Sequence, residues 1–130
     1  ANGRIVADAS VPYLGIGVLR EPVCCEVRDG FILSMTGGEQ ARMLYNDLLS
    51  RKDPNVFNIA ELGVGMNPCC SFMGFMLEDE GVEGSVHIGI GTSITLGGTV
   101  KAACHYDLIM TGATLVADGQ TLIEQGRLCL

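Results

Sequence analysis

The sequence of 130 residues has no tryptophan, only 5% aromatic residues and only eight Lys and Arg residues, which are scattered. A chain with net charge −7 and no basic stripe has nothing to neutralise phosphates, so we expect neither a nucleic acid nor an anionic membrane as partner. Nothing at the start resembles a signal peptide. The longest apolar run, residues 82–100, is interrupted by Glu83 and His87, which argues against a membrane span. We therefore expect a cytoplasmic protein.

Charge is scarce as well: the charged fraction is 18%, below the usual quarter, while hydrophobic residues make up 48%. Part of the surface is therefore expected to be covered, and we predict a homo-oligomer, foremost a dimer. The length corresponds to a single domain, residues 1–130. Six cysteines lack zinc-ribbon spacing, and the adjacent pairs Cys24-Cys25 and Cys69-Cys70 would point to opposite strand faces. We expect reduced, mostly buried thiols.

The hydrophobic patterns predict an α+β fold, a mostly antiparallel sheet with one main helix at about 39–50 and a short second helix at about 72–80. Asp29-Gly30 is typical of a two-residue hairpin turn. Thr36 and Glu39 have the spacing of a capping box at the start of the main helix. The other strand-like runs are residues 4–8, 14–19, 56–65, 85–91, 103–111, 114–117 and 121–124.

Both histidines of the chain lie in strand-like runs opposite an apolar face. His105 and Asp107 should share a strand face because strand side chains alternate, and His87 is followed by glycines that leave room beside it. With Glu61, two imidazoles and two carboxylates would suit a divalent metal. Alternatively, each histidine alone is a satisfied polar strand residue and the glycines only let another backbone pass. The acids at 78–80 are expected to be a solvated helix end.

At these residues the chain resembles the C-terminal portion of the aminopeptidase T family of metallopeptidases, which is related to leucyl aminopeptidases. The resemblance rests on Asn58–Pro68, Val86–Gly91 and His105–Asp107. It implies that Glu61, His87, His105 and Asp107 bind a pair of divalent metals, Zn²⁺, Co²⁺ or Mn²⁺. It further implies a hydrolase that uses metal-activated water to remove N-terminal residues from peptides. That family's remaining glutamate ligand is expected before residue 1.

A second function stays open, because the catalytic tyrosine of that family has no counterpart in residues 91–95. Ring-cleaving dioxygenases that act on dihydroxypyridines, small-molecule substrates, resemble the same family. They hold Fe²⁺ with two His and one Asp, including a motif like His105-Tyr106-Asp107. Glu61 favours the hydrolase, since the oxygenase needs no second carboxylate. A third hypothesis is a C-terminal domain without catalytic activity of its own.

Overall fold

The computed structural model describes residues 1–129 and confirms the predicted α+β fold. All pairings between its named strands are antiparallel, and one main helix, α1 (Glu39–Ser50), accompanies a short one, α2 (Met76–Asp79). No helix in this part of the chain is long and apolar enough to cross a membrane.

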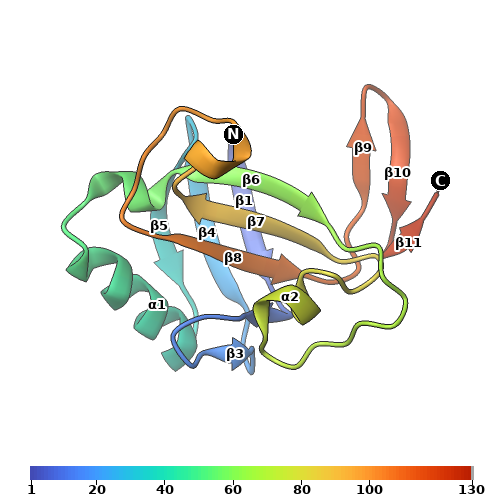
Figure 1. Cartoon of the computed structure of the whole chain (residues 1–130), viewed down its shortest axis with the longest axis horizontal. Helices are drawn as coiled ribbons and strands as arrows, with labels where there is room; N and C mark the ends of the chain where they lie inside the picture. The colour runs from blue at the N-terminus through green and yellow to red at the C-terminus, as the bar shows by residue number, and fades with distance from the viewer. Residues whose placement is uncertain (130) are drawn as a thin grey trace.

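The strands form three sheets (Figure 1). The largest has five strands in the order β3 (Gly17–Val18), β2 (Ser10–Val11), β8 (His105–Met110), β7 (Val86–Gly91) and β6 (Ile59–Val64). Behind it in Figure 1 lies a second sheet with the order β1 (Gly3–Ala7), β4 (Val23–Arg28) and β5 (Phe31–Thr36). The third, which projects to one side, has the order β11 (Arg127–Leu128), β10 (Gln120–Glu124) and β9 (Leu115–Ala117).

One apolar core joins the two larger sheets and α1. Leu44 and Leu48 of α1 are buried in the same cluster as Val23 of β4 and Ile90 and Leu108 of the five-stranded sheet. The buried helix positions follow the i, i+3, i+4, i+7 spacing that predicted α1, because that spacing places them on one helix face. The core therefore supports the face of β7 and β8 that carries Ile90 and Leu108.

The hairpin and the main helix are confirmed where the sequence predicted them. Asp29 and Gly30 have φ angles of 51° and 84°, as a type I′ turn between β4 and β5 requires. Helix α1 begins at Glu39, but the predicted capping box is wrong: Gly38 is the N-cap and no side chain caps the helix. Glycine at this position brings no side-chain oxygen to the first free N–H groups.

The second helix is one turn long, shorter than the predicted 72–80. Its first residues are drawn into a turn instead, because the Asp79 carboxylate accepts hydrogen bonds from the backbone N–H of Met73 and of Gly74. Gly74 has φ 85°, which a continuing right-handed helix does not permit.

Two other strand predictions are shortened by local turns. The run at 56–65 begins with a 3₁₀ turn, Pro54–Phe57, where the Asp53 side chain accepts from the N–H of Asn55. The run at 14–19 keeps only β3 as strand. The loop at 92–103 contains a further 3₁₀ turn, Ile94–Leu96.

The six cysteines are free, as expected. The prediction that they are mostly buried is wrong, because only Cys25 is buried, whereas Cys69 and Cys129 are exposed. Burial raises the pKa of the Cys25 thiol to about 12, and the neighbouring Cys24 and Glu26 add to this. Cys25 is therefore a thiol of the core and not a nucleophile at neutral pH.

Candidate metal centre

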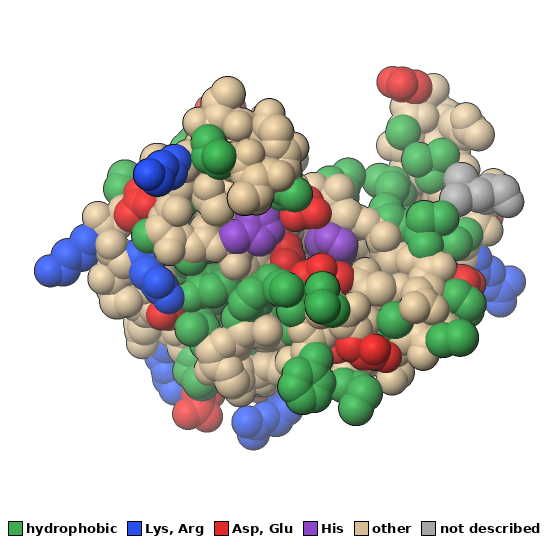
Figure 2. Space-filling view, in the orientation of Figure 1, with side chains coloured by type: hydrophobic (Ala, Val, Ile, Leu, Met, Phe, Trp, Pro, Cys, Tyr) green, Lys and Arg blue, Asp and Glu red, His purple; other side chains and the backbone are tan. Residues whose placement is uncertain are grey.

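The register of β6, β7 and β8 brings the predicted ligands to one sheet face. Gly89 in β7, which lies between β6 and β8, pairs with Glu61 on one side and with Asp107 on the other. Directly paired residues point to the same face, so both carboxylates stand beside the bare backbone of Gly89. In Figure 2 the two histidines lie on the viewed face, with acidic side chains between them.

Three side chains converge closely enough to hold one ion: Glu61, His105 and Asp107, hereafter the ligand group. One nitrogen or oxygen atom of each lies within 4.8 Å of the others. His105 Nε2 is 3.2 Å from Glu61 Oε2 and 3.3 Å from Asp107 Oδ1. His87, the fourth predicted ligand, adjoins this group, with its Nε2 3.6 Å from Glu61 Oε1.

Two glycines make the space in which the imidazoles lie. A Cβ atom on Gly63 would overlap the His87 ring. A Cβ atom on Gly89 would lie 2.8 Å from both Glu61 Cβ and His105 Nε2, closer than real Cβ contacts. The room beside His87 therefore comes from Gly63 and not from the glycines that follow His87. Of those, Gly91 lets another backbone pass close, as the second interpretation supposed.

His105 is oriented by the loop that follows β7. Its Nδ1 lies 2.8 Å from the backbone oxygen of Thr92. A carbonyl oxygen only accepts, so Nδ1 carries the hydrogen and Nε2 faces the two carboxylates. Burial lowers the pKa of His105, but the Thr92 hydrogen bond and the charges of Asp107 and Glu61 outweigh it and raise the pKa overall. This environment favours a positive charge at Nε2, either a proton or a metal ion.

Asp107 is held through one of its two oxygens. Oδ2 accepts a 2.6 Å hydrogen bond from the Tyr13 hydroxyl, while Oδ1 is buried and accepts none. Burial and this bond to Asp107 raise the pKa of Tyr13, so the hydroxyl keeps its proton. The ring nitrogen Nδ1 of His87 is likewise buried without a partner. A cation bound in this cluster would give Asp107 Oδ1 the partner that the protein itself does not provide.

The set of donors suits a divalent metal. Imidazole nitrogen with carboxylate oxygen binds Zn²⁺, Mn²⁺ and Fe²⁺, whereas no thiolate lies among the three atoms that converge. The space left by Gly63 and Gly89, the orientation of His105 and the free Oδ1 of Asp107 all agree with that chemistry. The described residues thus contain a group able to hold an ion, at three of the four predicted positions.

Sequence reasoning missed two side chains beside Asp107. Tyr13 comes from a turn 94 residues away, and no local pattern points to it. Glu80 belongs to the acids expected to be solvated, and that expectation is wrong for its neighbour Asp79, which is fully buried. Burial, interaction with Asp107 and the charges of Asp107 and Glu61 raise the pKa of Glu80 to about 7.

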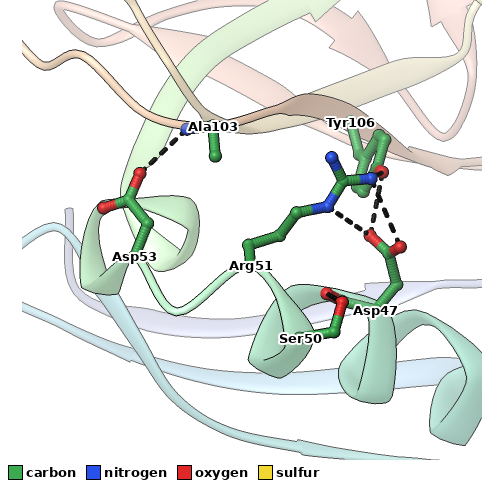
Figure 3. Close-up of polar contacts among 6 residues, drawn as sticks. All are labelled: Asp47, Ser50, Arg51, Asp53, Ala103 and Tyr106. Atoms are coloured by element: carbon green, nitrogen blue, oxygen red, sulfur yellow. Dashed lines mark hydrogen bonds and ion pairs between the residues drawn. The ribbon is translucent and has the colours of Figure 1, made fainter.

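Tyr106, between His105 and Asp107 in sequence, points to the other face, as strand alternation predicted. Its hydroxyl donates to Asp47 at 2.9 Å and accepts from Arg51 at 2.6 Å (Figure 3). Asp47 lies in the last turn of α1, and Arg51 directly follows the helix. Tyr106 thereby ties the ligand-bearing strand β8 to the helix.

Comparison with known proteins supplies a family. The model of the family described as NicX, 2,5-dihydroxypyridine 5,6-dioxygenase, matches residues 1–130. A curated 2,5-dihydroxypyridine 5,6-dioxygenase of Pseudomonas putida KT2440 is 25% identical over 136 residues, which cover 97% of this chain and 39% of that protein. A solved structure of 2,5-dihydroxypyridine dioxygenase from the same organism matches with a TM-score of 0.86 and 22% identity, over 98% of this chain and 40% of the other.

These findings correct the predicted family. The resemblance to aminopeptidase T, and with it the main prediction of a hydrolase that acts on peptides, is wrong; the findings support the dioxygenase alternative. The error has a physical reason. A histidine and an acid two residues apart on a strand present one nitrogen and one oxygen to any divalent metal, so the motif specifies metal binding more strongly than it specifies a reaction.

Proposed function

We propose that this chain, which belongs to the 2,5-dihydroxypyridine 5,6-dioxygenase family, forms the metal-binding part of an enzyme that opens the ring of a dihydroxypyridine with dioxygen. The match of the family model to residues 1–130 carries this proposal. The chain spans 39% of the length of the curated relative, so the substrate and the reaction of the whole protein are part of the proposal.

The ligand group would hold the ion. Glu61 and Asp107 supply carboxylate oxygens that offset its charge, and His105 supplies Nε2 in an orientation set by Thr92. His87 is a fourth donor close to Glu61. The reaction favours Fe²⁺ over the Zn²⁺ predicted with the hydrolase, because bound iron supplies the dioxygen chemistry that the closed-shell Zn²⁺ ion lacks.

Glu61 would also interact with the substrate. A dihydroxypyridine carries two ring hydroxyls, and their protons can pass to or be held by acceptors on the protein. The oxygen of Glu61 that does not bind the ion would be such an acceptor on the same face.

Loading the protein with Fe²⁺ or with Zn²⁺, both without oxygen, tests the proposed function. On addition of 2,5-dihydroxypyridine and oxygen, the iron-loaded protein should consume one O₂ for each ring that loses its aromatic absorbance. The zinc-loaded protein should bind metal but consume no oxygen, because Zn²⁺ has no redox chemistry. Iron retained in stoichiometric amount without loss of the ring would contradict the proposal.

His105→Ala is the variant that connects the reaction to the ligand group. It should lower bound iron at least about tenfold, as loss of a ligand exceeds the effect of an outer partner. Unchanged iron content in this variant would mean that His105 is only a structural residue.

The oligomer predicted from the low charged fraction also stays a prediction, and light scattering of the loaded protein would measure it.

A further inference from the structure

We infer that Tyr13 is a positioning residue for the proposed metal centre: its hydroxyl occupies Oδ2 of Asp107, so that Oδ1 is the oxygen presented to the ion. The inference rests on the function proposed above for the ligand group. Tyr13 itself lies in the turn between β2 and β3, and its hydroxyl contacts Oδ2 and no other member of the ligand group through a hydrogen bond in the described residues.

The contact is specific in its geometry. The Tyr13 oxygen lies 2.6 Å from Asp107 Oδ2, a short distance typical of a hydroxyl that donates to a charged carboxylate. Asp107 is only 3% exposed, so water does not compete for this oxygen as it would at a surface. A carboxylate can bind a metal through one oxygen or two. With Oδ2 engaged, Asp107 is set to bind through one.

The ring of Tyr13 is held in place by a second tyrosine. It packs on the ring of Tyr106 with centroids 4.9 Å apart. The Tyr106 hydroxyl is in turn held by Asp47 and Arg51 at the end of α1 (Figure 3). A series of direct contacts therefore runs from the helix through two tyrosines to Asp107.

The backbone of the turn that carries Tyr13 is fixed as well. The side-chain amide of Gln40, which is 8% exposed, donates to the backbone oxygens of Ile16 and Val18 at 2.9 Å. Its oxygen accepts from the N–H of Arg20 at 2.8 Å. Three bonds from one buried residue of α1 hold the segment just after Tyr13, so the hydroxyl is delivered by an ordered turn.

Removal of the hydroxyl would leave Oδ2 without its donor in a buried site. The carboxylate would then be free to rotate or to bind the ion through both oxygens. Partners that orient a metal ligand typically change metal affinity by about 10–100-fold when they are removed. A purely structural hydrogen bond would instead lower the stability of the metal-free protein and leave the affinity as it was.

Tyr13→Phe is the direct test, because phenylalanine keeps the ring on Tyr106 and removes only the hydroxyl. Calorimetric titration with Co²⁺, a probe whose visible absorption reports coordination, should show affinity at least about tenfold weaker than in the unchanged protein. The absorption bands of bound Co²⁺ should shift as Asp107 changes from one bound oxygen to two.

Two matched variants separate the inference from general damage. Tyr45→Phe removes the hydroxyl of a tyrosine on α1 that packs against Phe57, and it should leave affinity and spectrum unchanged. Tyr106→Phe keeps the ring under Tyr13 but loses the bonds to Asp47 and Arg51, so its effect should be smaller than that of Tyr13→Phe.

The outcomes distinguish this inference from the proposed function. If the unchanged protein binds Co²⁺ and Tyr13→Phe binds it equally well with the same spectrum, the positioning role is wrong and the metal centre stands. A lowered melting temperature of the metal-free variant with unchanged affinity overturns the role in the same way. If the unchanged protein binds neither Co²⁺ nor Fe²⁺, both the metal centre and the role of Tyr13 are wrong.

Discussion

Asp79 and Asp107 are the two buried carboxylates of residues 1–129, at 0% and 3% exposure, and they are satisfied in different ways. Asp79 accepts from the Ser10 hydroxyl at 2.6 Å and from the backbone N–H groups of Met73 at 2.8 Å and of Gly74 at 3.0 Å. Both of its oxygens have donors. Asp107 has a donor on Oδ2 and none on Oδ1.

The difference teaches that burial of an acid does not by itself mark a functional site. A buried carboxylate that is fully hydrogen-bonded repays its desolvation inside the protein, so Asp79 stabilises the turn before α2 and has no capacity left. Asp107 is left one oxygen short, beside Glu61 and His105, and this oxygen gains most from a cation.

The largest expected effect comes from removing the incomplete carboxylate. Asp107→Asn should weaken Fe²⁺ or Co²⁺ binding by more than about 100-fold, the upper end of what outer partners of a ligand cost, because an amide oxygen carries no charge. The free energy of unfolding of the metal-free variant should equal or exceed that of the metal-free unchanged protein. Titration calorimetry and urea unfolding measure the two quantities, and a variant that binds normally would break the comparison.

The complementary change should affect stability and not the metal. Asp79→Asn replaces an acceptor by an amide N–H₂ that faces other donors, which should cost about 2 kcal/mol of unfolding free energy. Under conditions in which the variant is fully folded, its metal affinity should stay within about a factor of two of that of the unchanged protein, since Asp79 contributes no atom to the ligand group. A normal stability with lost metal affinity would reverse the roles assigned to the two acids.

The smallest effect is on the pH dependence of the metal-free protein. The pKa of Glu80 is raised from 4.5 to about 7, by burial first and then by Asp107 and Glu61. The folded state then binds a proton that the unfolded state has lost, so stability should fall as pH rises from about 4.5 through about 7.

The same pair of variants separates the sources of this slope. Asp107→Asn removes one of the charges that hold the proton on Glu80 and should flatten the dependence, while Asp79→Asn should keep it. Urea unfolding at a series of pH values, in the presence of a chelator, measures both slopes. Equal slopes of unfolding free energy against pH in the two variants would show that the charge of Asp107 does not affect the pKa of Glu80.

Much of the fold followed from local patterns. The hairpin at Asp29-Gly30 and helix α1 were predictable because turn residues and apolar spacing act over a few neighbours. Local patterns failed where a distant or side-chain contact decided. Helix α2 begins later than predicted because the Asp79 carboxylate binds the backbone N–H groups that precede it. The same contact buries Asp79, one of the acids predicted to form a solvated helix end.

The sequence was enough to predict four candidate ligands. The same four residues did not distinguish the aminopeptidase T family from the dihydroxypyridine dioxygenases. Strand alternation alone places His105 and Asp107 on one face of their strand, whatever the rest of the chain does. The same alternation places Tyr106 on the opposite face of the strand. A strand face that carries a histidine and an acid was thus determined by the sequence itself.

Only the tertiary structure decided how the site is completed. The register of three strands brings Glu61 to His105 and leaves His87 beside them, and the turn at Tyr13 reaches Asp107 from 94 residues away. Which of two buried acids is satisfied and which is left open depends on these long-range contacts. Local sequence cannot encode that choice, because the donors to a side chain come from wherever the folded chain brings them.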